Sequence, residues 1–281
     1  MGIAVARDEI RESVGPAARM VALVAKKLRL LKGLTQEQEG ALMGYSGAAI
    51  SALERLVHPV SDEMLVKLEE VLGEGTGIFD DMRLPVRLEK LPEQFRDYLL
   101  IEQQALSLYL YALPNVHGLF QTEAYARAQI AGGYPPPSPE RVEELVRARI
   151  GRKAIFNKEP MRHIELILDE SALRRKFGSE EIMREQYRYL AECAGYKNVT
   201  LQVLSLDIGL TGENAGARGE LNLVETDDHS PIVYLEIQDE SVLITEPAKV
   251  TTYAHRYAKI RAQALSARES LALIERLAGE G

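Results

Sequence analysis

The sequence predicts an α+β protein in which an all-helical domain, residues 1–77, precedes a larger α+β domain, residues 78–281. Three observations support this. The first seventy-odd residues show helical periodicity and helix caps without a strand pattern, and the period-two or β-branched runs all come after residue 160. Three glycines within residues 73–77 separate the regions as a flexible connector. With 281 residues, 46% of them hydrophobic, the chain can bury sizeable cores.

The first predicted helix, residues 20–31, is amphipathic. Its apolar residues recur at steps of three and four, and Gly33 follows as a stop. We expect an apolar face toward the core and a cationic face toward solvent. The apolar set is Met20, Val21, Val24, Leu28 and Leu31, and the cationic set is Lys26, Lys27, Arg29 and Lys32.

Two short helices joined by a glycine-containing turn come next. Thr35 and Gln38 form a capping box that begins the first, and Gly44 suits a left-handed C-cap at its end. Ser46 caps the second helix, and Ser61 caps a further one. This spacing is typical of the helix-turn-helix, whose second helix lies in the DNA major groove.

The amino acids at individual positions characterise this motif more specifically than its spacing does. Segments 33–37, 44–46, 50–51 and 53–54 read Gly-Leu-Thr-Gln-Glu, Gly-Tyr-Ser, Ile-Ser and Leu-Glu. They closely resemble the lambda-repressor-like or XRE family of helix-turn-helix domains. The resemblance implies binding to double-stranded DNA, with Gln36 anchoring a phosphate. It also implies that Ser46, Gly47, Ala48, Ser51 and Ala52 face DNA, and we expect Lys26 and Arg55 to contact phosphates.

Two features depart from the family pattern. Glu39 stands where an apolar residue is usual and Gly40 replaces an alanine, so we expect a less stable, less well packed helix. The second helix, residues 47–52, offers no Arg, Gln or Asn to read base edges, and within it only the Ser51 side chain can hydrogen-bond. Methyl contacts or DNA shape would then carry specificity. The alternative is an interaction protein that keeps a degenerate helix-turn-helix as a docking surface and does not bind DNA.

Charge is distributed to suit local phosphate binding. The net charge of −8, from 34 Lys and Arg against 42 Asp and Glu, excludes a protein that grips polyanions by bulk charge. Residues 16–58 nevertheless carry +3, so the remainder carries −11. A solvated helix face explains the lysines of this segment equally well. The six basic residues are Arg19, Lys26, Lys27, Arg29, Lys32 and Arg55, and the three acidic ones are Glu37, Glu39 and Glu54.

The C-terminal region mixes helices and strands. Helices are predicted over residues 98–112 and 121–131, from Ser138-Pro139, from Ser179 and from the capping box Ser266-x-x-Glu269. We expect the strands to form one small, mostly antiparallel sheet. They are predicted over residues 163–168, 199–204, 220–224, 232–237 and 242–245.

Five segments of this region carry a second resemblance. They look like the C-terminal domain of actinobacterial XRE regulators that include the WhiJ-type developmental regulators. The match runs in order over roughly residues 85–280. It implies a transcriptional regulator whose C-terminal domain senses a signal, often with a small partner protein encoded nearby, and it implies no catalytic residues. The segments are 117–127, 168–175, 198–204, 233–236 and 271–274.

A candidate ligand or partner groove follows from those segments. We expect Gln121, Tyr125, Arg174, Arg175 and Glu236 to lie near one another and to line it. A structural reading stands beside this one. Asp169 would cap the helix that begins at Glu170, the two arginines would pair with nearby acids, and Gln121 would satisfy backbone amides at a helix start.

Composition excludes other classes of protein. One cysteine, Cys193, and no charged-then-apolar leader favour a reducing cytoplasm, and no apolar stretch approaches the ~20 residues of a membrane span. Five dispersed histidines without nucleophile, phosphate-loop or metal-ligand spacing argue against an enzyme, a metal site and a cofactor.

The working unit is predicted to be a homodimer. One helix-turn-helix covers half of a palindromic site, and linking two domains raises avidity. We expect the C-terminal domain to form the dimer, with residues 73–77 letting two DNA-binding domains reach half-sites about 34 Å apart.

Overall fold

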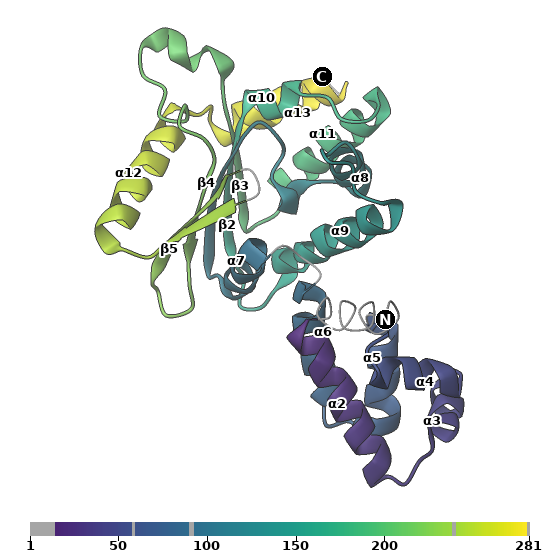
Figure 1. Ribbon diagram of the computed structural model, residues 1–281. Coiled ribbons are helices and arrows are strands. Elements are labelled where there is room, and N and C mark those ends of the chain that lie inside the picture. The colour runs from purple at the N-terminus through teal and green to yellow at the C-terminus, as the bar shows by residue number, and fades with distance from the viewer. Residues whose placement is uncertain (1–14, 58–59, 90–92, 238–239, 280–281) are drawn as a thin grey trace. The chain divides into compact units, whose positions relative to one another are not determined.

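The computed structural model describes residues 15–57, 60–89, 93–237 and 240–279. The chain forms two compact units, Met1–Arg96 and Asp97–Gly281 (Figure 1). This division lies later than the boundary expected at residue 77. The reason is the helix α6 (Ile78–Glu89), which packs against helices of the first unit.

The N-terminal unit is helical in its described part, as the sequence predicts. Its helices pack around one core that includes Val21, Ile50, Leu65 and Phe79, none of them measurably exposed. The elements before α6 are α2 (Pro16–Leu31), α3 (Gln36–Met43), α4 (Gly47–Glu54), α5 (Asp62–Leu68) and a π-helical turn (Glu69–Gly73).

The glycine-rich segment 73–77 is not the free connector that its composition indicates. The carboxylate of Glu69 accepts hydrogen bonds from the backbone amides of Gly77, at 2.7 Å, and Phe79, at 2.8 Å. Phe79 is fully buried in the core. A buried carboxylate and an aromatic anchor therefore hold the segment in place, a constraint that composition does not reveal.

The buried face of α2 also differs from the predicted one. Met20 and Leu31 are 51% and 75% exposed, whereas Ala22, Ala25 and Arg29 are buried. Ala22 and Ala25 have small side chains, so neighbouring helices can approach this face of α2 closely. The larger side chains of Met20 and Leu31 therefore stay exposed to solvent. Arg29, expected on the cationic solvent face, instead lies inside the unit.

The C-terminal unit contains a six-stranded mixed sheet, which corrects the expected small, mostly antiparallel one. The strand order is β3-β2-β1-β4-β5-β6, with β1, β2 and β3 mutually parallel and the other pairings antiparallel. The strands are β1 (Ser107–Ala112), β2 (His163–Asp169), β3 (Val199–Leu204), β4 (Leu221–Glu225), β5 (Pro231–Ile237) and β6 (Glu240–Ile244).

The strand β1 overturns the predicted helix over residues 98–112. Helix α7 (Glu93–Gln104) ends first, and residues 107–112 then form a central strand. Leu108 and Leu110 are fully buried, and Tyr111, on the opposite face, is 1% exposed. A strand covered on both faces is apolar throughout, so its sequence lacks the polar alternation that separates a strand from a helix.

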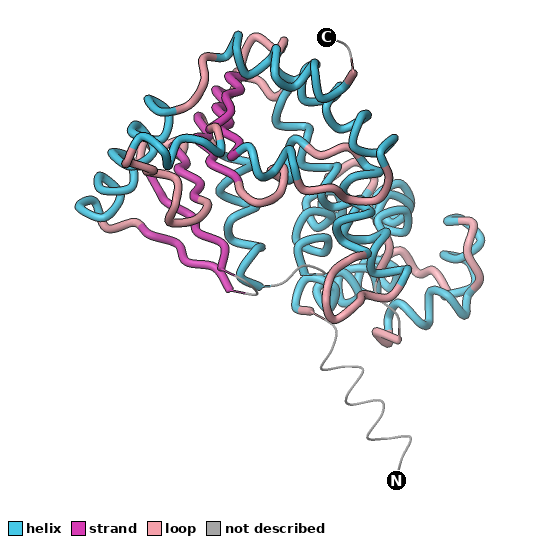
Figure 2. Tube along the Cα trace, turned by 90° about the horizontal axis from the view of Figure 1, so that it is seen from above, coloured by secondary structure: helices cyan, strands magenta, loops and turns pink. Residues whose placement is uncertain are grey.

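Helices cover both faces of this sheet. Figure 1 shows α12 on one face and α8, α9 and α11 on the other, and Figure 2 shows the strands between these layers from above. Tyr257 and Ile260 of α12 pack with Tyr111 and Leu221 in one core cluster. The helices are α8 (Glu123–Ala131), α9 (Pro139–Gly151), α10 (Glu170–Arg174), α11 (Glu180–Ala194), α12 (Pro247–Gln263) and α13 (Ala267–Ala278).

Several predicted helix caps are present here. The Ser138, Ser179 and Ser266 side chains accept hydrogen bonds from amides in the first turns of α9, α11 and α13, and Ser266 and Glu269 form the capping box. Among the helices of the described residues, we find none with the length and apolar character needed to cross a membrane.

Candidate functional site

The candidate DNA interface is the α3-turn-α4 motif. The Thr35 and Gln38 capping box begins α3, Gly44 ends it at a φ of 77°, and the Ser46 hydroxyl accepts from the Ala49 amide at 3.2 Å to begin α4. Gly40 was expected to weaken α3, yet it serves the turn. A side-chain carbon on it would come within 2.8 Å of the Tyr45 carbonyl oxygen, so glycine lets the turn pack closely.

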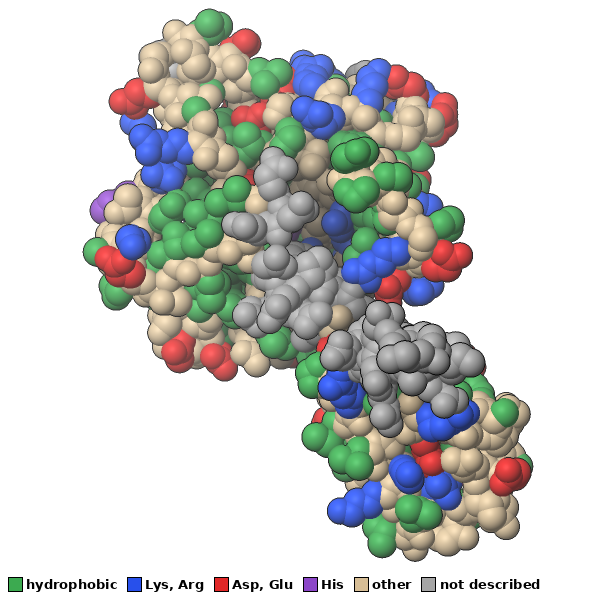
Figure 3. Space-filling model, in the orientation of Figure 1, with side chains coloured by type: hydrophobic (Ala, Val, Ile, Leu, Met, Phe, Trp, Pro, Cys, Tyr) green, Lys and Arg blue, Asp and Glu red, His purple; other side chains and the backbone are tan. Residues whose placement is uncertain are grey.

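The residues predicted to face DNA are reachable from solvent. Ser46 and Ala48 are exposed, and Gly47, Ser51 and Ala52 are partly exposed. Side chains of Lys and Arg are spread over the face of the N-terminal unit drawn in Figure 3. Lys26 and Arg55 are exposed, and the Arg55 guanidinium also donates to the Ser51 carbonyl at 3.1 Å, which steadies it at the end of α4.

A buried ion cluster lies beneath this surface. The Arg29 guanidinium donates to both carboxylate oxygens of Glu54, at 2.6 and 3.1 Å, and to the Leu34 carbonyl at 2.8 Å. Gln36 donates an amide hydrogen to Glu54 at 2.8 Å. The cluster ties α2 to both motif helices and fixes the orientation of Gln36.

Glu39 makes this cluster electrostatically unbalanced. Its carboxylate is fully buried 3.5 Å from the Arg29 Nε, and neither of its oxygens has a hydrogen-bond partner within the described residues. Burial and the Glu54 charge raise the pKa of Glu39 to about 7, against the opposing effect of Arg29. Two carboxylates thus share one guanidinium.

Two of the six counted cations are not available for phosphate contacts. Arg29 is buried in the ion cluster, and the Lys32 ammonium donates to the Val71 carbonyl at 2.9 Å and pairs with Glu74. Arg19, Lys26, Lys27 and Arg55 remain exposed. The cationic face is therefore smaller than the sequence count indicates.

The five residues of the predicted groove have different surroundings. Gln121 and Tyr125 are buried beside each other, and both bond to the Val116 backbone, Gln121 to its carbonyl and Tyr125 to its amide. Glu236 is exposed on β5, and Arg175 is exposed at the end of α10. Arg174 is turned toward Glu170, with which it pairs at 2.6 Å, as the structural reading expected. Asp169 caps α10 through the Ser171 amide at 2.9 Å.

Arg149, at the end of α9, lies close to some of these five residues. Its Nη1 donates to the amide oxygens of Gln121, at 3.0 Å, and Gln129, at 2.9 Å. Burial and the nearby Arg152 lower the pKa of Arg149 to about 10, while the Glu236 and Tyr125 charges act in the opposite direction. Gln121, Tyr125 and Glu236 therefore all lie around Arg149.

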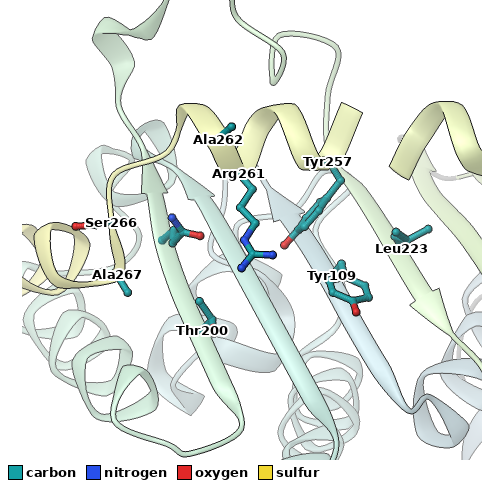
Figure 4. A pocket seen from close by; sticks show the side chains of 10 residues that line it. Tyr109, Thr200, Leu223, Tyr257, Arg261, Ala262, Ser266 and Ala267 are labelled. Atoms are coloured by element: carbon teal, nitrogen blue, oxygen red, sulfur yellow. The ribbon is translucent and has the colours of Figure 1, made fainter. Parts of the chain in front are cut away.

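The opposite face of the sheet has a groove of about 700 Å³ beneath α12 (Figure 4). Tyr257 and Arg261 reach from α12 toward the strands, with their polar ends side by side, and Tyr109 faces them from β1. Arg261 pairs with the buried Glu165 at 3.2 Å. Alanines and leucine supply much of the rest of the wall, so the groove can hold an apolar or aromatic molecule. The lining residues are Tyr109, Thr200, Gln202, Leu223, Tyr257, Ala258, Arg261, Ala262, Ser266 and Ala267.

Comparison with known families identifies both units. The helix-turn-helix family HTH_3 matches residues 26–79. The domain of unknown function DUF5753 matches residues 95–276, well over half of the chain. The chain belongs to the DUF5753 family. No match was found among curated proteins or among solved structures.

The combination agrees with the regulator architecture that the two sequence resemblances imply. An XRE-type helix-turn-helix precedes a C-terminal DUF5753 domain. The DNA-binding character therefore rests on the N-terminal motif, and the DUF5753 match leaves the chemistry of the C-terminal domain open. Within its described residues, no group of three or more His, Cys, Asp and Glu side chains could hold a metal ion.

Sequence reasoning missed Arg149 in the DUF5753 domain. The signal was present in α9, because Val142, Val146 and Arg149 recur at steps of four and three and so share one helix face. Val142 and Val146 are buried. An arginine in step with buried valines predicts a guanidinium directed toward the interior, and this same pattern places Arg29 on the buried face of α2.

Proposed function

We propose that this protein is a cytoplasmic transcriptional regulator that binds double-stranded DNA through α3 and α4 and receives a signal in its DUF5753 domain. The observation that carries the proposal is the helix-turn-helix match on a motif with intact caps and exposed cations beside it. The signal is a small molecule or a small partner protein. Gln121, Tyr125, Arg174, Arg175 and Glu236 are the proposed contacts.

Phosphate contacts dominate the proposed binding mode. The exposed face of α4 presents Ala48, Ser51 and Ala52, which supply methyl groups and one hydroxyl for bases. Lys26 and Arg55 are proposed to contact phosphates. Gln36 gives one amide hydrogen to Glu54 and keeps the other for a phosphate, so the buried cluster orients the anchor that the family resemblance implies.

Fluorescence anisotropy tests this proposal with promoter-region DNA from the protein's own source and with scrambled DNA, at several salt concentrations. We expect affinity to fall steeply with salt, and Lys26→Ala and Arg55→Ala each to weaken binding to both DNAs alike. Each variant should reduce the slope of log affinity against log salt by about 0.9, the value for one lost phosphate contact.

Lys67→Ala is the matched control, because Lys67 of α5 is partly exposed in the same unit but pairs with Glu70 of the following π-helical turn. It should leave both slopes unchanged. A change in preference at one base pair, with the salt slope intact, would contradict the phosphate-dominated mode. Absence of binding to either DNA at low salt would favour the docking-surface alternative.

We also propose a homodimer formed through the DUF5753 domain, because a half-site read by alanines gives one monomer little specific affinity. Residues 73–77 cannot supply the adjustment between DNA-binding domains, since they are fixed to the N-terminal core. Light scattering at micromolar concentration should give twice the monomer mass of 31.3 kDa. A monomer that stays monomeric on operator DNA would rule the dimer out.

A further inference from the structure

The DUF5753 domain holds two guanidinium groups beside the backbone of Gly118. A side-chain carbon on Gly118 would lie 2.9 Å from the Arg152 Nη1 and 3.7 Å from the Arg149 Nε. The two cations therefore approach the same point from α9 and the turn that follows it. Because Gly118 has no side chain, the Arg152 guanidinium can pack directly against its backbone, with Arg149 close by.

The two cations differ in how their charge is compensated. Arg152 makes a buried, two-pronged pair with Glu102, at 2.8 and 2.6 Å. Arg149 is partly exposed, and among the described residues its hydrogen bonds reach only the neutral amide oxygens of Gln121 and Gln129. Both of those bonds use Nη1, which leaves the Nε and Nη2 hydrogens free to bind something else.

Neighbouring groups do not neutralise Arg149. His117, which precedes Gly118, has its pKa held well below the usual range by burial and by both arginines, so its imidazole is neutral. Glu236 is near enough to act on both guanidinium groups, yet it is exposed and no ion pair within 4.0 Å joins it to either in the described structure. A partly buried cation without a carboxylate partner favours an anionic ligand.

We propose that Arg149 binds the carboxylate or phosphate group of a small-molecule signal, beside Gly118 and His117. Gln121 and Gln129 hold the guanidinium in place through Nη1, so its two remaining donor groups can face the ligand oxygens. The neutral His117 ring adds a donor at Nε2, because its Nδ1 accepts the Leu119 amide at 3.4 Å. This inference deepens the signal-receiving role proposed above and rests on it.

Thermal unfolding of the full-length protein tests the site with two probes, sodium phosphate and sodium succinate, each compared with sodium chloride of equal ionic strength. At a concentration about tenfold above Kd, we expect at least one probe to raise the Tm of the wild type by about 3 °C. Arg149→Gln should abolish the rise. Arg147→Gln, an exposed arginine on the same helix, should keep it.

The two probes distinguish the two ligand sources, since a shift with phosphate alone indicates a phosphorylated signal and a shift with succinate alone a carboxylate. Arg149→Lys keeps the positive charge but loses the planar guanidinium. We expect it to weaken binding of the probe at least threefold in calorimetric titration. This variant tests the site even if Arg149→Gln does not fold. No shift with either probe in the wild type, or an equal shift in Arg149→Gln, would overturn the site. DNA affinity measured on the same samples reports separately on the proposed regulator function.

Discussion

The two units each contain an arginine cluster, and the clusters have opposite imbalances. In the N-terminal unit one guanidinium, Arg29, serves two carboxylates, Glu39 and Glu54. In the C-terminal unit two guanidinium groups, Arg149 and Arg152, meet beside Gly118, and the buried carboxylate of Glu102 pairs with Arg152. The pKa of Glu39 is raised and that of Arg149 is lowered, so in both clusters the surplus group is driven toward its neutral form.

The surplus charge in the two clusters can be compensated in different ways. A surplus carboxylate that is fully buried can be neutralised by a proton, which needs no space. A surplus arginine keeps its charge under physiological conditions and is partly exposed, so an ion from outside must compensate it. The comparison therefore predicts that the stability of the N-terminal unit depends on pH and that the stability of the C-terminal unit depends on bound anions.

Arg29→Met should have the largest effect on stability. The substitution leaves Glu39 and Glu54 buried without their shared cation, and removing one partner of a buried ion pair costs about 3–5 kcal/mol. Urea unfolding followed by circular dichroism measures the loss. Arg55→Met, an exposed cation on the edge of the same motif, is the control and should cost less than about 1 kcal/mol.

Glu39→Gln should reveal the proton sensitivity. The pKa of Glu39 in the folded state, about 7, lies above its ordinary value of 4.5, so protonation favours the folded form. The stabilising contribution is complete below pH 4.5 and is lost as the pH rises through 7, amounting to about 3 kcal/mol.

The variant removes this dependence. We expect Glu39→Gln to stabilise the N-terminal unit at pH 8 by about 1–3 kcal/mol and to change little at pH 5, because the wild-type carboxyl is already mostly protonated there. Urea unfolding at both values gives the comparison. Equal effects at pH 5 and pH 8 would mean that the Glu39 charge does not govern the cluster.

Arg149→Gln should cost little in the absence of an anion. The lost hydrogen bonds to Gln121 and Gln129 are offset by removing a desolvated cation and its repulsion from Arg152, so we expect a change below about 1 kcal/mol. Unfolding in chloride buffer measures it. A loss as large as that for Arg29→Met would show that Arg149 is a structural cation, and the contrast between the two clusters would fail.

Arg174→Ala should have the smallest effect. Its side chain is 52% exposed and pairs with Glu170 at one helix-turn spacing, so we expect a loss of about 0.5 kcal/mol. A measured loss above 2 kcal/mol would indicate a role that its exposure does not explain.

Local sequence signals predicted much of the fold. The capping residues Thr35, Ser46, Ser138 and Ser266 begin helices at the positions expected, because a hydroxyl before an apolar period has a local mechanism. The five predicted strands all exist, with ends shifted by two residues at most. Helices α6 and α12 were not predicted. Their positions depend on packing partners distant in the sequence.

The errors share one physical cause. The strand β1 was taken for a helix because both its faces are buried, and burial on both faces removes the alternation that marks a strand. The cationic face of α2 was overestimated because Arg29 was counted by its charge and not by its place among Val21, Ala25 and other buried residues. In both cases the deciding neighbours are supplied by the tertiary fold.

The position of β1 in the sheet has a consequence for synthesis on the ribosome. Its parallel partner β2 begins at His163, after a crossover that contains α8 and α9, but its antiparallel partner β4 begins only at Leu221. Until β4 emerges, one edge of a strand that contains the buried Leu108 and Leu110 has no partner in the sheet. Nascent chains that stop before residue 221 therefore expose an apolar pairing edge, and premature termination there should yield aggregates that chaperones must bind or proteases remove.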